Sequence, residues 1–192
     1  MSDLDAVLKI GGSLLAFPQH LRATIAAIEI VARARRVLVV PGGGPFADVV
    51  REFGRRFQLP EDTTHWMAVL AMDQYAHLLA SQFDRGVLVR DCHQLGGAGN
   101  SVVPVLAPSS WLRQRDPLPH TWNITGDSIA AWVAGVAGAR LLILIKAPHA
   151  AGDDLLDPCF FQTLPEGVTH AIVTADRLSD LLSVVDGSAE RR

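Results

Sequence analysis

The chain is poor in the residues that mark several common classes of protein. Its two cysteines, Cys92 and Cys159, lack the ligand spacing of a metal site, so both thiols are expected to stay reduced in a cytoplasmic protein. The net charge is −3 and basic residues form no long run, which argues against a nucleic-acid-binding surface. No apolar run reaches the roughly 18 residues of a membrane span, and residues 1–10 lack the basic start of a signal peptide. We therefore expect a cytoplasmic protein that binds neither nucleic acid nor membrane.

Lysine is especially scarce. Lys and Arg together number 17, and the lysines among them are Lys9 and Lys146. Both lie at the end of a short apolar run. In a chain that uses Arg elsewhere, these two positions are candidates for sites that need a compact ammonium group and not a planar guanidinium. Chance retention is the alternative, and the position of both lysines argues against it.

Three familiar catalytic motifs are also missing. The chain contains no G-x-x-x-x-G-K-[ST] P-loop, no G-x-G-x-x-G fingerprint and no G-x-S-x-G nucleophile elbow. A P-loop kinase, a Rossmann dehydrogenase and an α/β-hydrolase are therefore not expected.

Short apolar runs alternate with segments of helical periodicity along the chain. We predict strands over residues 6–10, 37–40, 87–90, 102–106, 141–145 and 170–173, and helices over 19–33, 46–57, 62–83, 109–111, 128–137 and 175–184. Pro104 favours an edge or hairpin position for its strand, and the apolar stripe of the second helix (Phe46, Val49, Val50, Phe53 and Phe57) is expected to face the core. This alternation predicts an α/β fold, a three-layer αβα sandwich with a mainly parallel sheet, as one domain over residues 1–192.

Two of the predicted strands run directly into glycines. Residues 37–40 lead into Pro41 and Gly42, Gly43 and Gly44, and residues 6–10 lead into Gly11, Gly12 and Ser13. Glycines between a strand and a helix let backbone N–H groups approach an anion, and the helix dipole adds positive potential there. A tight turn without a ligand is the alternative interpretation. Three successive glycines after a buried strand favour the anion site.

These glycines and both lysines fall at the carboxyl ends of predicted strands, where ligands bind in parallel sheets. Asp127 opens a helix on the same expected edge, although Asp127 or Ser128 could be a plain N-cap. A carboxylate between two lysines would fix both ammonium groups and stay ionised. Positioned positive charge is the main requirement of phosphoryl transfer, so the pattern predicts that chemistry. The polar segment 113–123 either covers this site or is a plain connector.

Three segments of the sequence resemble the amino acid kinase superfamily. They are VLKIGGSLL at residues 7–15, VVPGGGPFADVV at 39–50 and WNITGDSIAAWVAGVAGARLLILIKA at 122–147. The resemblance implies an αβα sandwich, ATP and Mg²⁺ as cofactors, and a homodimer. Within the family, the phrase at residues 125–132 is most similar to the kinases of methanofuran synthesis, which phosphorylate an aminomethylfuran methyl phosphate.

The resemblance also implies a role for individual residues. Lys9, Asp127 and Lys146 would be the catalytic residues, with Asp127 organising the other two. Gly11, Gly12 and Ser13, with the two lysines, would bind the nucleotide. Gly42, Gly43 and Gly44, with Asn123 and Thr125, would bind a phosphorylated or carboxylate acceptor. No residue of the chain is assigned as a metal ligand.

The sequence departs from the family pattern after Lys146. Pro148 and His149 stand where the family has Asp-Gly, and Asp153 and Asp154 add negative charge. A proline removes a backbone donor, so we expect a weaker nucleotide site or one completed by another chain. The alternative to a kinase is therefore a non-catalytic protein on the kinase fold that binds an oxyanion or assembles with an active homologue.

Overall fold

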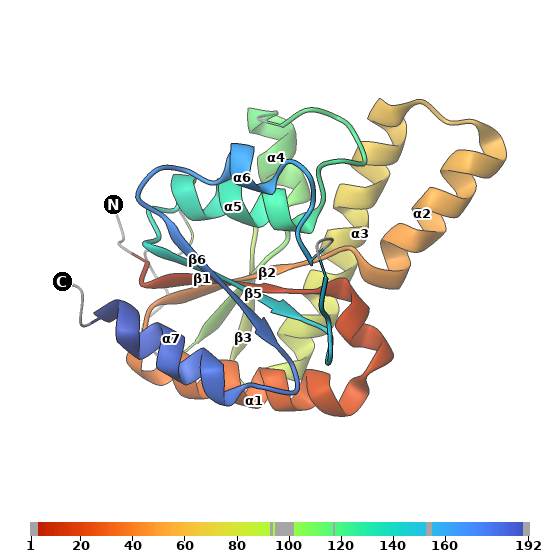
Figure 1. The fold of residues 1–192 in the computed structure, drawn as a ribbon. Helices are drawn as coiled ribbons and strands as arrows, with labels where there is room; N and C mark the ends of the chain where they lie inside the picture. The colour runs from red at the N-terminus through yellow and green to blue at the C-terminus, as the bar shows by residue number, and fades with distance from the viewer. Residues whose placement is uncertain (1–3, 93, 95–101, 117, 153–154, 190–192) are drawn as a thin grey trace.

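A parallel β-sheet forms the centre of the molecule (Figure 1). The computed structural model describes residues 4–92, 94, 102–116, 118–152 and 155–189. Within them the strand order is β3-β4-β2-β1-β5-β6, and every pair of neighbours is parallel. The strands are β1 (Ala6–Ile10), β2 (Val37–Pro41), β3 (Gly86–Val89), β4 (Val103–Leu106), β5 (Leu141–Lys146) and β6 (Thr169–Thr174). The prediction of a parallel α/β fold is confirmed.

Helices cover both faces of this sheet (Figure 1). On one face lie α1 (Pro18–Ala34) and α7 (Ser179–Ala189), and on the other lie α4 (Ser109–Arg115), α5 (Gly126–Val136) and α6 (Phe160–Thr163). The long helix α3 (Glu61–Gln82) packs on β3 and β4 and adds side chains to both apolar cores. Because both faces are covered, all residues of β1 and β2 are buried, which explains their continuous apolar runs. No described helix has both the length and the apolar character needed to cross a membrane.

The two central strands bring three loops together. β1 pairs with β2 on one side and with β5 on the other, in registers that place Ile10 beside both Pro41 and Ile145. The carboxyl ends of β1, β2 and β5 therefore lie at the same level. The short 3-10 helix η1 (Gly12–Ala16) follows β1, and α2 (Gly44–Phe57) follows β2.

The prediction that Pro104 marks an edge or hairpin strand is wrong. β4 lies inside the sheet, between β3 and β2. The N–H groups of Val103 and Ala107 donate to β3 and its preceding residue, so by alternation Pro104 presents its nitrogen to β2. Pairing between β2 and β4 is limited to Val39 and Val105. The N–H group that Pro104 lacks would therefore face β2, where the hydrogen-bonded pairing with β4 is already short. For this reason an inner strand can contain the proline.

The expectation that the apolar stripe of α2 faces the core is only partly correct. Val50 is buried and Phe46 packs against the core, but Val49, Phe53 and Phe57 are exposed. The helix packs mainly on α3 and stands away from the sheet (Figure 1), so one side of it has no layer to bury against. Phe53 and Phe57 stack on one another on this exposed side.

Candidate active site

A buried charge triad lies where β1, β5 and α5 meet. The ammonium group of Lys9, from β1, is 2.7 Å from Oδ1 of Asp127. The ammonium group of Lys146, at the end of β5, donates a hydrogen bond of 2.7 Å to Oδ2 of the same carboxylate. Lys9 and Asp127 are 6% and 4% exposed. The structure thus brings together the three side chains that the sequence proposed as catalytic.

Burial and the neighbouring charges of the triad shift the pKa values of Asp127 and Lys146. Burial acts to raise the pKa of Asp127, but the nearby ammonium groups of Lys9 and Lys146 outweigh it and hold that pKa below its usual value. Burial, together with the charge of Lys9, lowers the pKa of Lys146 despite the opposing effect of Asp127. Asp127 therefore remains an ionised hydrogen-bond acceptor, and the triad carries one net positive charge when both lysines are protonated.

The two glycine-rich loops pack against each other beside this triad. A Cβ on Gly12 would lie 2.1 Å from the backbone nitrogen of Gly44, and a Cβ on Gly42 would lie 2.8 Å from the backbone nitrogen of Gly12. Gly44 also has a φ of +55° at the start of α2, which favours glycine. The tight-turn interpretation therefore accounts for part of the glycine content. It does not exclude anion binding, because the start of α2 still lines the cavity when the two loops are in contact.

The start of α5 is held by an aspartate that sequence reasoning missed. Asp157 accepts hydrogen bonds of 2.9 Å from the backbone N–H and the hydroxyl of Thr125 and from the N–H of Ser128. It also accepts one from the Ser128 hydroxyl. Thr125 is the N-cap of α5, and its Oγ1 lies 3.5 Å from the backbone nitrogen of Asp127. Because Thr125 is the N-cap, the carboxylate of Asp127 does not cap the helix and instead contacts the two lysines.

A cavity of about 540 Å³ opens from the triad toward α2 and α3. The sequence-predicted residues that line it are Lys9, Gly12, Ser13, Gly42, Gly43, Gly44, Thr125, Asp127 and Lys146. Two predicted residues are not in its lining. Gly11 instead donates its N–H to the carbonyl of Ile145, and Asn123 is exposed. The triad end of the cavity is called the inner end below.

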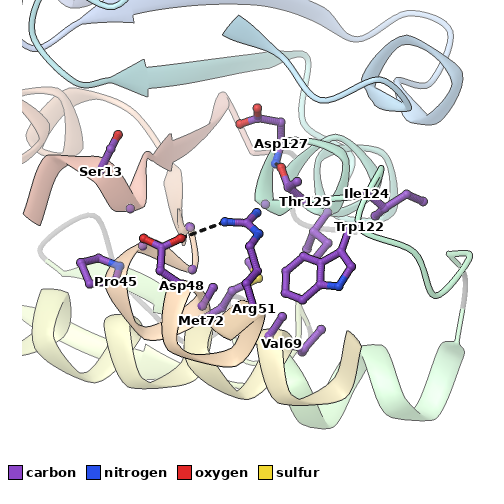
Figure 2. A pocket seen from close by; sticks show the side chains of 18 of the residues that line it. Ser13, Pro45, Asp48, Arg51, Val69, Met72, Trp122, Ile124, Thr125 and Asp127 are labelled. Atoms are coloured by element: carbon purple, nitrogen blue, oxygen red, sulfur yellow. Dashed lines mark hydrogen bonds and ion pairs between the residues drawn. The ribbon is translucent and has the colours of Figure 1, made fainter. Parts of the chain in front are cut away.

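A second polar group in the cavity lining, called its outer end, consists of Asp48 and Arg51 from α2 and of Trp122 (Figure 2). Arg51 lies between the other two: its Nη1 is 2.9 Å from Oδ1 of Asp48, and its guanidinium carbon is 4.7 Å from the centre of the Trp122 ring. Ala47, Asp48 and Arg51 share a face of the helix that follows the glycine loop. That spacing was the available sequence signal for the α2 residues, whereas Trp122 comes from a distant segment.

The segment that carries Trp122 is fastened to α3 by His120. Its Nδ1 lies 2.6 Å from Asp62 and its Nε2 lies 2.7 Å from Asp116, while its ring stacks on His65 at 4.1 Å. Burial, and then the charge of His120, lowers the pKa of His65 to about 4. Of the two interpretations of residues 113–123, cover of the site is supported, because Thr121 and Trp122 line the cavity.

The segment after Lys146 turns toward β6. Pro148 is buried, and the exposed His149 has a φ of +59°. His149 donates its backbone N–H to Asp176 at 3.1 Å, and its Nδ1 lies 3.0 Å from the same carboxylate. Asp153 and Asp154, expected to add negative charge here, lie outside the described residues. The departure from the family pattern therefore forms an anchored turn.

Comparison with known proteins gives consistent results. The model of the amino acid kinase family matches residues 6–148. A [5-(aminomethyl)furan-3-yl]methyl phosphate kinase of Methanocaldococcus jannaschii is 26% identical over 189 residues, covering 93% of this chain and 78% of that protein. Among solved structures, uridylate kinase from Archaeoglobus fulgidus has a TM-score of 0.71 at 18% identity and covers 96% of each chain. UMP kinase from Ureaplasma parvum has a TM-score of 0.69 at 14% identity, covering 95% of this chain and 96% of its own. These likenesses confirm the fold.

Proposed function

This chain belongs to the amino acid kinase family, and from that membership we propose that it transfers the γ-phosphoryl group of ATP to a small phosphorylated acceptor. The observation that carries the proposal is the triad of Lys9, Asp127 and Lys146 at the inner end of the cavity. Two ammonium groups, one buried and one partly buried, held 2.7 Å from one carboxylate are preorganised positive charge, and phosphoryl transfer depends mainly on such charge and on positioning.

Each member of the triad has a distinct part in this proposal. Lys9 and Lys146 stabilise the negative charge of the group in transfer, and Asp127 orients both ammonium groups. Asp127 acts as an acceptor of hydrogen bonds and not as a general base, because the two lysines hold its pKa below the usual value. A phosphate monoester is largely ionised at pH 7, its second pKa being about 6. A phosphate acceptor therefore needs no base to remove a proton.

The residues present fit a nucleotide phosphate at the inner end. Lys146, Gly12 and Ser13 line the cavity beside Lys9, and Lys146 with the backbone of η1 would hold the phosphates. Among the described residues, no group of three or more His, Cys, Asp or Glu side chains is arranged to hold a metal ion. Mg²⁺ would therefore be held chiefly by the nucleotide, where it supplies charge neutralisation of the phosphates.

We propose that the acceptor is an aminomethylfuran methyl phosphate or a close analogue. Two observations support this: the 26% identity to a kinase named for that substrate, and a cavity of about 540 Å³, within the range of small-molecule sites. A carboxylate acceptor is the alternative. The positive charge at the inner end attracts a phosphate and a carboxylate alike. The choice between the two acceptors therefore depends on whether the outer end recognises a ring and an amine.

The test is ADP release by the purified protein with Mg-ATP and each of four acceptors: [5-(aminomethyl)furan-3-yl]methyl phosphate, UMP, aspartate and N-acetylglutamate. Turnover with the first, lost in Asp127→Asn, supports the proposal. Turnover with one of the others in its place would overturn the acceptor assignment.

The second candidate is a non-catalytic binding or assembly protein on the same fold. It is favoured by the turn at Pro148 and His149, which is anchored to Asp176 where the family pattern has a nucleotide loop. Calorimetric titration with Mg-ATP separates the two. A protein that binds the acceptor phosphate but shows no heat with millimolar Mg-ATP has this second function.

We further propose a homodimer, with a hetero-complex with a homologue as the alternative. The exposed apolar side of α2, with Val49, Phe53 and Phe57, is the surface proposed to meet the second copy. Light scattering on the wild-type protein and on Phe57→Glu tests this. A dimer that becomes monomeric in the variant is expected, and a wild-type monomer refutes it.

A further inference from the structure

We propose that Asp48 at the outer end of the cavity selects acceptors that carry a primary ammonium group at the end opposite their phosphate. This inference rests on the proposed function, because it takes the inner end as the place of the acceptor phosphate. It assigns a specificity-determining residue and a substrate class: short amines in which a flat ring separates an ammonium group from a phosphate monoester.

The first support is the distribution of charge along the cavity. At the inner end Lys9 and Lys146 outnumber Asp127, which leaves one net positive charge beside the start of α2. Farther out, Asp48 and Glu61 line the cavity with one guanidinium, that of Arg51, which leaves one net negative charge. A ligand with a phosphate at one end and an ammonium group at the other matches this polarity.

The second support is the state of the Asp48 carboxylate. Among the residues that the structure describes, its partner is Arg51, which contacts Oδ1 at 2.9 Å. Oδ2 therefore stays available to a ligand. Arg51 is itself held by Asp48 and by the face of Trp122, and with Glu61 also in the lining the net charge of this end is negative. This end can therefore still bind a hydrogen-bond donor that carries a positive charge.

The third support is an apolar wall of the cavity. Val69, Met72 and Ile124 line the cavity between α3 and α5, beside Trp122 (Figure 2). All three are buried. A flat ring loses little by leaving water for such a wall, whereas a polar chain such as that of an amino acid would leave hydrogen bonds unmade there. The wall therefore favours an acceptor that carries a ring.

The experiment compares two acceptors that differ in charge but hardly in shape. They are [5-(aminomethyl)furan-3-yl]methyl phosphate and (5-ethylfuran-3-yl)methyl phosphate, which replaces the ammonium group by a methyl group. Wild-type kcat/KM is expected to favour the amine about tenfold or more, as a charge-assisted hydrogen bond allows. In Asp48→Asn this preference is expected to fall to about twofold or less, through a higher KM for the amine, with the KM for ATP unchanged.

The control is Glu52→Gln, which removes an exposed carboxylate of the same helix that does not line the cavity; its preference for the amine is expected to match wild type. Thermal melts check that Asp48→Asn is folded. A preference that survives in Asp48→Asn, or equal use of both acceptors by wild type, overturns the assignment and leaves the proposed kinase function standing. Failure of the wild type to use or bind either acceptor overturns the proposed acceptor, and the assignment with it.

Discussion

Asp127→Asn is expected to destabilise the protein strongly at pH 7 and much less at pH 9. The carboxylate is 4% exposed and lies 2.7 Å from each of two ammonium groups. An amide of the same shape leaves the buried Lys9 and the partly buried Lys146 beside a neutral group. Removing one partner of a buried ion pair costs about 3–5 kcal/mol, so the free energy of unfolding should fall by an amount in that range or slightly below it.

The variant has one way to limit this loss, which is to release a proton from a lysine. With an ordinary lysine pKa of about 10.4, deprotonation costs about 4.6 kcal/mol at pH 7 and about 1.9 kcal/mol at pH 9, at 1.36 kcal/mol per pH unit. Lys146 is the lysine expected to respond, because burial and Lys9 already lower its pKa. We therefore expect a loss of about 3 kcal/mol at pH 7 and of less than about 2 kcal/mol at pH 9.

The sign of this pH dependence follows from proton linkage. In the variant the folded-state pKa of Lys146 lies below its unfolded value, so between these two values the unfolded chain binds more protons and stability rises with pH. In the wild-type protein Asp127 has a lowered pKa and stays ionised from pH 7 to pH 9. Its own contribution therefore does not change over this window. Because Asp127 acts to raise the pKa of Lys146, that pKa is lower in the variant than in wild type, and the deficit of the variant should shrink.

Urea denaturation of both proteins at pH 7 and pH 9 measures the deficit. Asp48→Asn is the matched control, because it removes a carboxylate whose side chain is 67% exposed and has one ion-pair partner; its cost should stay below about 1 kcal/mol at both pH values. A deficit of Asp127→Asn below about 1 kcal/mol, or one equal at both pH values, would refute the electrostatic account of the triad.

Three further substitutions test other parts of the site. Lys9→Arg should lower kcat at least about 100-fold in a protein that still folds, because a planar guanidinium cannot take the place of the compact ammonium group where a Cβ on Gly126 would already lie 3.3 Å from the lysine Cε. Thermal melts check the fold, and full activity would contradict the role given to Lys9. Asp157→Ala should lower the free energy of unfolding by about 1–3 kcal/mol, because it leaves donors at the start of α5 unpaired. Asp157→Asn should partly rescue stability and kcat, and an unchanged thermal melt of Asp157→Ala would contradict this role. Replacing residues 148–149 with Asp-Gly should tighten Mg-ATP binding in calorimetry; submicromolar binding by the wild-type protein would show that the native turn already serves the nucleotide.

Much of the fold follows from local sequence patterns, but the position of β4 does not. Buried strands read as apolar runs, and helix boundaries follow capping signals such as Gly138, whose φ of +68° ends α5 as expected. Pro104 misled the prediction because a proline excludes a donor from one side of a strand only. Which neighbour lies on that side depends on strand order, and strand order is set by tertiary packing.

The inner end of the site was accessible from sequence because its signals are local. The scarce lysines at strand ends and the glycines before helices can each be recognised from a few neighbouring residues. Asp157 gave no such signal, since the groups it binds are 29 and 32 residues away. The pairing of Arg51 with Trp122 likewise joins α2 to the segment before α5, and nothing in either segment alone specifies that contact.

The contact between the two glycine-rich loops has a consequence for how ligands bind. No side chain separates Gly12 from Gly44, so backbone meets backbone and neither loop can shift without displacing the other. The loop after β1 is the proposed nucleotide side, and the loop after β2 is the proposed acceptor side. Occupancy of one should therefore change the affinity of the other, and by thermodynamic linkage the factor must be the same in both directions. Calorimetric titrations of a non-hydrolysable ATP analogue with and without acceptor, and the reverse pair, measure this factor; a factor of one would show that the touching loops behave as an immobile platform.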